Sequence, residues 1–176
     1  MKNKIVKFIG FSGSGKTTLI EKIVKKLSSE GIKVATVKHD VHGLDIDKEG
    51  KDSYRYSKAG ANISIVSSPE LTVYKYHKEL SLNDIISKID DVDLIIVEGY
   101  SSDVNIPTIC VGRLDTGKGF KGINTDCSFD KNIIALISDY TDKEINDIMK
   151  INDNLKHFNI NDDIEELIDF IKSLDS

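Results

Sequence analysis

Short apolar runs of strand length alternate along the chain with segments whose apolar residues recur at helical spacing. The pattern predicts strands over residues 4–10, 33–38, 61–68, 71–78, 93–99, 106–112 and 132–138. It predicts helices through residues 19–27 and over residues 51–59, 81–89, 141–150 and 162–174. Strands that are apolar on both faces and are separated by helices are typical of a parallel sheet. We therefore expect a three-layer α/β fold, with a mainly parallel β-sheet wrapped by helices, in a single domain over residues 1–176.

Some segments carry sharper signals than the overall alternation. Residues 93–99, DLIIVEG, form a nearly continuous apolar run, whereas residues 71–78, LTVYKYHK, alternate as a half-exposed strand does. Gly31 is placed to stop the first helix. Asn161 is the expected N-cap residue of the last helix. The apolar residues expected on one face of that helix are Ile164, Leu167, Ile168, Ile171 and Leu174.

Residues 10–17 read GFSGSGKT and fit the phosphate-loop pattern GxxxxGK[ST] without a mismatch. An expected strand precedes them and an amphipathic helix follows, as the motif requires. Glycines let backbone N–H groups surround a phosphate, Lys16 reaches the terminal phosphates, and the Thr17 hydroxyl binds Mg²⁺. The start of the helix adds its dipole. We therefore predict a P-loop NTPase fold with these nucleotide-binding residues: Gly10, Ser12, Gly13, Ser14, Gly15, Lys16, Thr17 and Thr18.

A second glycine-rich stretch follows the expected strand 106–112. Residues 112–119, GRLDTGKG, match the phosphate-loop pattern as far as Lys118, but Gly119 replaces the hydroxyl residue. No helical spacing follows, so the stretch lacks both the magnesium ligand and the helix dipole. We expect residues 113–131 to form a mobile loop and not a second nucleotide site.

The expected strand 93–99 carries a carboxylate near each end, Asp93 and Glu98. At about 3.3 Å per residue the two lie about 16 Å apart. Ligands of parallel sheets bind beyond the carboxyl ends of the strands, which places Glu98 on the edge of the phosphate loop and Asp93 on the opposite edge. We expect Glu98 to hold magnesium through water or to orient the attacking water. The alternative for Glu98 is an acid at the N-terminus of a helix or a plain surface charge.

Residues 38–53, KHDVHGLDIDKEGKDS, follow the strand 33–38 at the same sheet edge. This geometry places His39 beside the phosphate loop, and Asp45 and Asp47 point the same way if the backbone between them is extended. We interpret the segment as a nucleotide-facing, switch-like loop in which His39 binds nucleotide. The candidate catalytic residues are Lys16, Asp47 and Glu98, and the candidate magnesium ligands are Thr17, Asp47 and Glu98.

Three blocks of the sequence together resemble the molybdopterin-guanine dinucleotide biosynthesis adaptor protein B (MobB) family: residues 10–19, 38–61 and 93–100. The middle block is the most family-specific, since it contains KH, D-x-D, GKDS, an aromatic residue and AGA in that order. The order and spacing of the blocks extend the resemblance over residues 1–112. Past Val111 the resemblance is weak, with ALISD at residues 135–139 as the candidate last strand and loop.

The resemblance implies GTP and Mg²⁺ as cofactors, slow GTP hydrolysis and a homodimer. It implies an adaptor role in molybdenum cofactor biosynthesis, in partnership with the molybdenum cofactor guanylyltransferase that attaches GMP to molybdopterin. Molybdopterin itself is a further candidate ligand. The sequence contains no N/T-K-x-D motif, but a carboxylate at the sheet edge suits the two adjacent donors of guanine. Asp139 is the candidate for this contact, and an N-cap role for the following helix is the alternative.

Two other functional classes remain open on the sequence. A P-loop small-molecule kinase usually needs several lid arginines, whereas this chain has only Arg55 and Arg113, with the loop lysines as poor substitutes. A metal-delivery GTPase, similar to the urease and hydrogenase maturation proteins, would use His39, His42 and the nearby acids. No cysteine joins these histidines, and the sequence has no His-rich tract.

Composition narrows the cellular setting. The net charge of −5 does not favour binding to nucleic acid. No apolar run approaches the roughly 18 residues of a membrane span, and the apolar stretch after the basic N-terminus is too short for a signal peptide. Cys110 and Cys127 have no recognisable spacing and are expected to be free thiols. We expect a cytoplasmic protein that binds neither nucleic acid nor membranes.

Overall fold

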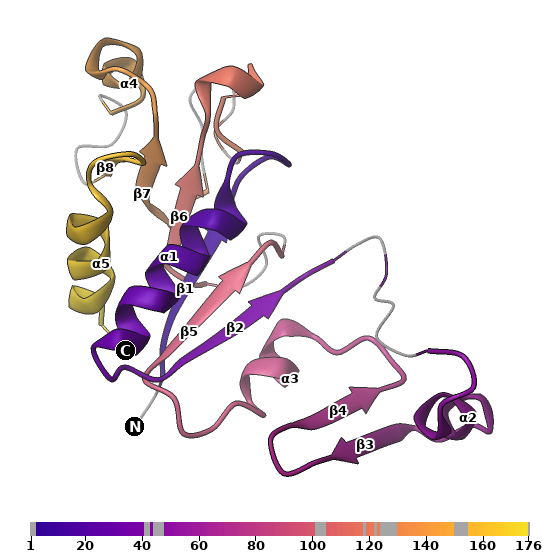
Figure 1. The fold of residues 1–176 in the computed structure, drawn as a ribbon. Coiled ribbons are helices and arrows are strands. Elements are labelled where there is room, and N and C mark those ends of the chain that lie inside the picture. The colour runs from indigo at the N-terminus through magenta and orange to yellow at the C-terminus, as the bar shows by residue number, and fades with distance from the viewer. Residues whose placement is uncertain are drawn as a thin grey trace. The chain divides into compact units, whose positions relative to one another are not determined.

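The computed structural model describes residues 3–40, 43, 48–100, 105–117, 119–121, 123, 130–149 and 155–175. The chain forms two compact units (Figure 1). The sheet unit comprises Met1–His39 and Asp90–Ser176, and the hairpin unit comprises Asp40–Ile89. The expectation of one nucleotide-binding domain over residues 1–176 stays a prediction.

The sheet unit is built on a six-stranded sheet with the strand order β2-β5-β1-β6-β7-β8 (Figure 1). Its strands are β1 (Lys4–Ile9), β2 (Val34–Lys38), β5 (Leu94–Glu98), β6 (Thr108–Val111), β7 (Ile133–Ser138) and β8 (Lys156–Asn159). Every neighbouring pair is parallel, so the carboxyl ends of all six strands lie at one edge of the sheet. The predicted α/β fold with a mainly parallel sheet is confirmed.

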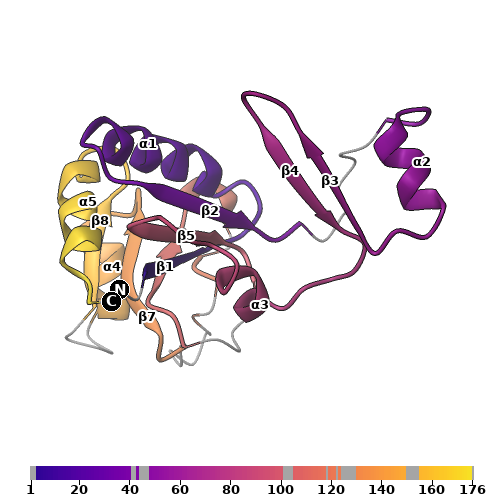
Figure 2. The same ribbon diagram turned by 90° about the horizontal axis from the view of Figure 1, so that it is seen from below.

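Helices cover both faces of this sheet. They are α1 (Lys16–Ser29), the 3₁₀ helix η1 (Leu114–Thr116), α4 (Asp142–Met149) and α5 (Ile164–Ser173). Val6 and Phe8 of β1 point to the face on which α1 and α5 lie side by side (Figure 2). Ile9, with the opposite orientation in the strand, packs with Leu136 of β7 and Ile145 of α4. Each face therefore has its own apolar cluster, as the strands with two apolar faces predicted.

Two elements near the C-terminus differ from the sequence prediction. The pattern gives no signal for β8, whose sequence KHFN has one apolar residue, Phe158. This strand lies at the edge of the sheet and pairs only with β7, so less of it is buried than of a central strand. The helix α5 begins at Ile164 with Asp163 in the N-cap position, two residues later than the expected cap at Asn161.

Part of the segment predicted as a mobile loop packs firmly on β6. Phe120 is only 5% exposed, and a Cβ atom at Gly112 would lie 2.6 Å from its ring. The Cys110 thiol donates a hydrogen bond to the carbonyl oxygen of Lys121 at 3.0 Å. The expectation of a mobile loop over residues 113–131 is therefore wrong for these described residues, because a single buried aromatic ring anchors them.

The hairpin unit contains α2 (Asp52–Lys58), β3 (Ile63–Ser67), β4 (Thr72–Tyr76) and α3 (Leu82–Ile86). The strands β3 and β4 form an antiparallel two-stranded sheet in which Ile65 lies opposite Tyr74. Among residues 48–89, all of which are described, only Ser64 and Leu82 are buried. The hairpin unit therefore has almost no core of its own.

Candidate nucleotide-binding site

The phosphate loop connects the end of β1 at Ile9 with the start of α1 at Lys16. Two of its glycines have positive φ angles, 85° at Gly13 and 82° at Gly15, which other residues rarely adopt. Gly15 is the N-cap residue of α1, and no described side chain caps the helix. The first N–H groups of α1 are therefore available to a ligand, and the helix dipole favours an anion there.

Gly10 and Ser14 pack closely together beneath the loop. A Cβ atom at Gly10 would lie 2.5 Å from the carbonyl oxygen of Val111 and 2.7 Å from Ser14 Oγ. Ser14 Oγ is buried and has no hydrogen-bond partner within the described part of the chain. A buried hydroxyl without a partner is unfavourable because it has lost its bonds to water. A phosphate oxygen would supply the missing partner, so the loop fits a bound nucleotide.

The Lys16 ammonium lies over the loop itself. Its Nζ atom donates hydrogen bonds to the carbonyl oxygens of Gly10 at 3.0 Å and Phe11 at 2.9 Å. Burial lowers the pKa of Lys16, Glu98 opposes this shift, and the charges of nearby lysines add to it. A nearby anion stabilises a partly buried ammonium, and a bound phosphate would provide that anion.

Thr17, in the first turn of α1, and Glu98, at the end of β5, meet at the same sheet edge. The Thr17 hydroxyl donates to Glu98 Oε1 at 3.1 Å, and Oε2 lies 3.4 Å away. Hydroxyl and carboxylate oxygens are ligands that Mg²⁺ prefers, so this pair fits the predicted cation. Asp93 lies at the other edge, where its carboxylate accepts the Lys33 N–H at 2.8 Å. Asp47, the third predicted magnesium ligand, lies outside the described residues.

His39 follows β2 at the carboxyl edge of the sheet. Its N–H donates to the carbonyl oxygen of Glu98 at 3.0 Å, and its ring stacks on Tyr100 with centroids 4.6 Å apart. Gly99 has a φ of 82°, and a Cβ atom there would lie 3.4 Å from the His39 carbonyl oxygen. The structure therefore brings His39 to the end of the strand that carries Glu98, while His42 and Asp45 lie outside the described residues.

Asp139, directly after β7, is paired with an arginine that the sequence did not suggest for this site. Its Oδ2 atom lies 3.2 Å from Arg113 Nη1, and its Oδ1 atom accepts the Leu114 N–H at 2.8 Å. Two guanidinium nitrogens of Arg113 lie 3.6 Å from where a Cβ atom at Gly15 would be. The sequence feature that could have identified Arg113 as a site residue is its position after the strand β6, which ends at the same sheet edge.

Asp139 does not serve as the N-cap of the helix that follows it. The helix α4 begins at Asp142, and the Glu144 carboxylate accepts the Thr141 N–H at 2.9 Å, as in a capping box. Burial raises the pKa of Asp139, but the hydrogen bond from Leu114 and the pair with Arg113 outweigh it, so the pKa is lowered. Asp139 is therefore an ionised acceptor at neutral pH.

Comparison with known families decides the relationship of this chain. Residues 5–139 match the family described as "Molybdopterin guanine dinucleotide synthesis protein B". The chain belongs to the MobB family. The molybdopterin-guanine dinucleotide biosynthesis adapter protein of Escherichia coli (strain K12) is 35% identical over 173 residues, which cover 95% of this chain and 90% of that protein. The crystal structure of Bacillus subtilis MobB matches with a TM-score of 0.69 and 27% identity, over 97% of this chain and 96% of that chain.

The MobB match extends further along the chain than the resemblance in the sequence suggested. It continues past Val111 to residue 139 and so includes β6, η1, β7 and Asp139. The hydrogenase maturation factor HypB from Archaeoglobus fulgidus shares the fold alone, with a TM-score of 0.55 and 16% identity over 98% of this chain and 89% of that chain. The family match therefore includes ALISD at residues 135–139, the candidate last strand and loop.

Proposed function

We propose that this protein is a GTP-binding adaptor with weak GTPase activity that assists the attachment of GMP to molybdopterin, which forms molybdopterin guanine dinucleotide. Membership of the MobB family supports the biosynthetic role, since the E. coli relative is named an adapter protein of this biosynthesis. The observation that carries nucleotide binding is the buried Ser14 hydroxyl, which has no partner among the described residues and lies within a complete phosphate loop.

Nucleotide binding redirects Lys16 from the carbonyl oxygens of Gly10 and Phe11 to the terminal phosphates. The exchange is favourable because burial disfavours the ammonium charge and the phosphates compensate it. The N–H groups at Gly13, Gly15 and the start of α1 surround the phosphate, and Ser14 donates its hydroxyl to an oxygen. The remaining contact residues of the loop are Ser12, Thr17 and Thr18.

The residues that would hold Mg²⁺ are Thr17, Glu98 and Asp47. When bound, the cation neutralises the charge on the phosphates. The hydrogen bond from Thr17 fixes the carboxylate of Glu98 at the end of β5, from where Glu98 orients the attacking water together with Asp47. We propose that this hydrolysis is slow, as the family resemblance implies, and that the protein acts mainly as an adaptor.

The base and the partner surfaces complete the proposal. Asp139 accepts the two adjacent donors of guanine, and His39 contacts the nucleotide from the end of β2. The hairpin unit exposes a set of large apolar side chains, as sites of protein association do: Tyr56, Ile63, Ile65, Val66, Leu71 and Tyr74. These form the homodimer contact, while the guanylyltransferase and molybdopterin are the partners of the assembled protein. No helix in the described part of the chain is long and apolar enough to cross a bilayer, and we propose a cytoplasmic location.

Competition binding of GTP, ATP and GDP, each with and without Mg²⁺, tests this function. We expect GTP to compete best with Mg²⁺ present, and we expect Lys16→Ala to abolish binding because it removes the cation that contacts the terminal phosphates. Lys25→Ala, which removes an exposed lysine on the same helix, is the matched control and should bind as the wild type does. Micromolar affinity retained by Lys16→Ala would contradict the proposal, and equal competition by ATP would contradict its base specificity.

A further inference from the structure

Arg113 connects the phosphate loop with the carboxylate proposed to bind the base. Its Nε and Nη2 atoms lie 3.6 Å from the position that a Cβ atom at Gly15 would occupy. Its Nη1 atom lies 3.2 Å from Asp139 Oδ2, and the second Asp139 oxygen accepts the Leu114 N–H at 2.8 Å. The guanidinium therefore lies between the last glycine of the phosphate loop and the end of β7.

This ion pair is partly shielded from water, with 31% of the Arg113 side chain and 23% of the Asp139 side chain exposed. Such a pair next to a phosphate loop is sensitive to nucleotide binding. Phosphates attract the guanidinium, which binds phosphate oxygens well, and they repel the carboxylate. A bound nucleotide is thus expected to pull on the two members of the pair in opposite directions.

The donor edge of guanine resembles the group that now contacts Asp139. Guanine presents its ring N1–H and its 2-amino group side by side in one plane. A guanidinium likewise presents planar, adjacent N–H donors that fit a carboxylate. Asp139 Oδ2 can therefore exchange one kind of donor for the other, while Oδ1 keeps the hydrogen bond from Leu114.

We propose that Arg113 is a specificity-determining residue: it competes with guanine for Asp139, and binding of the base moves its guanidinium to the nucleotide phosphates. This inference rests on the proposed GTP binding. Adenine cannot make the exchange, because its N1 atom is an acceptor and would face a carboxylate oxygen. ATP therefore leaves Arg113 on Asp139, and the phosphates lose that cation. Recognition of guanine by Asp139 and neutralisation of the phosphate charge by Arg113 are therefore coupled.

The chain offers a direct test because it contains only two arginines, Arg55 and Arg113. Arg55 lies in the hairpin unit, 3.6 Å from Asp52, and serves as an internal reference. With ¹⁵N-labelled arginine, NMR spectra should show two side-chain Nε–H signals, of which the one lost in Arg113→Lys belongs to Arg113. We expect GDP with Mg²⁺ to shift the Arg113 signal and leave the Arg55 signal in place, whereas ADP with Mg²⁺ shifts neither.

Affinity and turnover provide the second measurement. Arg113→Ala removes the competitor at Asp139, so we expect guanosine, which has no phosphates to receive the displaced guanidinium, to bind about two- to fivefold more tightly, the range of a partly exposed ion pair. Hydrolysis at saturating GTP should fall about tenfold, because a cation is lost from the phosphates. Asp139→Asn should lose the preference for guanine and shift the Arg113 signal without nucleotide. Arg55→Ala should change none of these quantities.

Each alternative result overturns the exchange in a distinguishable way. Guanosine binding that is unchanged or weaker in Arg113→Ala would mean that Arg113 does not compete with the base at Asp139. An Arg113 signal unchanged by GDP, in wild-type protein that binds GDP, would mean that the pair is only structural. Absence of guanine nucleotide binding by the wild-type protein would overturn the proposed function and the exchange together.

Discussion

The sheet unit and the hairpin unit differ in where they keep their apolar side chains. In the sheet unit the large side chains of Phe8, Ile23 and Leu167 are 0% exposed. In the hairpin unit Tyr56 and Tyr74 are 64% and 62% exposed. The first unit completes a core from its own residues, whereas the second carries large apolar side chains at its surface.

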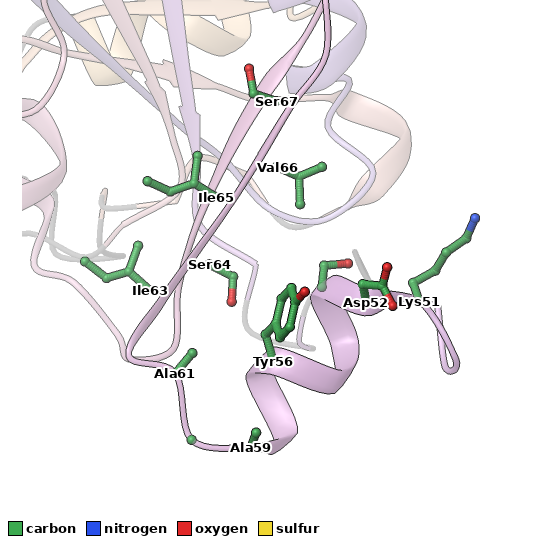
Figure 3. Close-up of a pocket in the computed structure, with 12 residues that line it drawn as sticks. Lys51, Asp52, Tyr56, Ala59, Ala61, Ile63, Ser64, Ile65, Val66 and Ser67 are labelled. Carbon is green, nitrogen blue, oxygen red and sulfur yellow. The ribbon is translucent and has the colours of Figure 1, made fainter.

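The hairpin unit carries apolar side chains on both faces of its two-stranded sheet. Figure 3 shows Tyr56 on the side of β3 to which Ser64 and Val66 point, while Ile63 and Ile65 point away. A hollow of about 920 Å³ lies along α2 and β3 and is lined by these residues. Two-stranded sheets are marginally stable alone, so further packing is expected to stabilise this one.

The largest expected contrast between the two units is in stability. Ile109→Ala in β6 creates a cavity at a side chain that is 0% exposed, and we expect it to lower the free energy of unfolding by about 2–5 kcal/mol. The matched change Ile65→Ala in β3, where the side chain is 57% exposed, should cost less than about 0.5 kcal/mol at a concentration where the protein is monomeric. Urea denaturation of both variants measures this, and equal losses would remove the distinction between the units.

Thiol reactivity gives the next largest contrast. Burial raises the pKa of Cys110 to about 12, so at pH 8 the thiol stays protonated and unreactive. Two single-cysteine proteins allow the comparison, both with Cys127→Ser: one keeps Cys110, and the other carries Cys110→Ala and Ile65→Cys. We expect iodoacetamide to modify Cys110 in the first about a hundredfold more slowly than the introduced cysteine in the second. Mass spectrometry follows the reaction. Comparable rates would show that the face of the sheet covered by α4 and Phe120 opens readily.

A smaller effect is expected on self-association. Ile65→Asp places a charge opposite Tyr74 on the exposed face of the β3–β4 sheet, and we expect it to raise the dissociation constant of the proposed homodimer about tenfold. Leu114→Asp alters an exposed apolar residue of the sheet unit, 48% exposed, and is the matched control. Sedimentation equilibrium separates the outcomes. If only Leu114→Asp weakened the dimer, the association surface would lie in the sheet unit and not in the hairpin unit.

The sequence predicts those parts of the fold that depend on neighbouring residues. The central strands were recognisable because both faces are buried and their residues are therefore apolar. The edge strand β8 carries no such run, since Lys156 and His157 of its four residues are not buried. Likewise α5 begins where the backbone turns at Asp163 and not at the first residue with a suitable side chain. Local pattern identifies an element better than it locates its ends.

The same distinction holds within the candidate site. The phosphate loop is visible in the sequence because consecutive residues contain its whole geometry, and Glu98 follows from the rule that ligands bind at the carboxyl edge of a parallel sheet. The pair of Arg113 and Asp139 joins residues 26 positions apart. It depends on β6 and β7 being neighbours in the sheet, and on Arg113 reaching Gly15 from the end of β6. Strand order is a tertiary property, so the pair could not be predicted from residue types.

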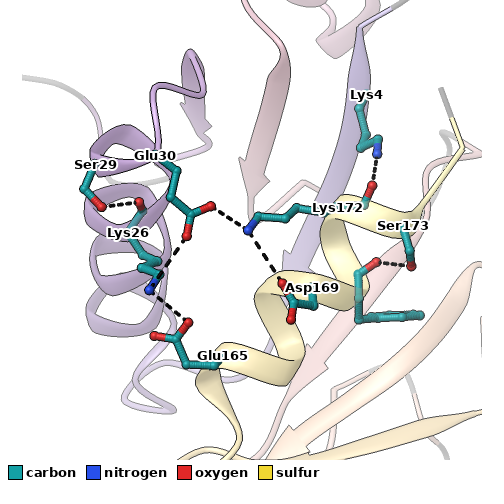
Figure 4. A network of polar contacts seen from close by, with 9 residues as sticks. Lys4, Lys26, Ser29, Glu30, Glu165, Asp169, Lys172 and Ser173 are labelled. Carbon is teal, nitrogen blue, oxygen red and sulfur yellow. Dashed lines mark hydrogen bonds and ion pairs between the residues drawn. The ribbon is translucent and has the colours of Figure 1, made fainter.

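The smallest expected effect concerns the surface of the sheet unit, where Glu30, the C-cap residue of α1, contacts Lys172 of α5 at 2.5 Å and Lys26 at 3.7 Å (Figure 4). Such exposed pairs contribute little to stability because water screens them. The hydrogen bond from Lys172 is the main cause that lowers the pKa of Glu30 below its ordinary value of 4.5. The stability that this ion pair contributes is thus present above pH 4.5 and is lost as the pH falls through the lowered pKa of Glu30.

We therefore expect Glu30→Gln to be slightly less stable than the wild type at pH 7. The difference should shrink as the pH falls from 7 toward about 3, through the lowered pKa of Glu30, and in about 1 M salt, which screens the charges. Glu21→Gln, on the same helix and exposed, should match the wild type at both pH values. Denaturant titration of the three proteins measures the difference. A loss that persists at low pH would assign the role of Glu30 to packing between α1 and α5, and the apolar contacts of that face would then account for the docking of these helices without help from charge.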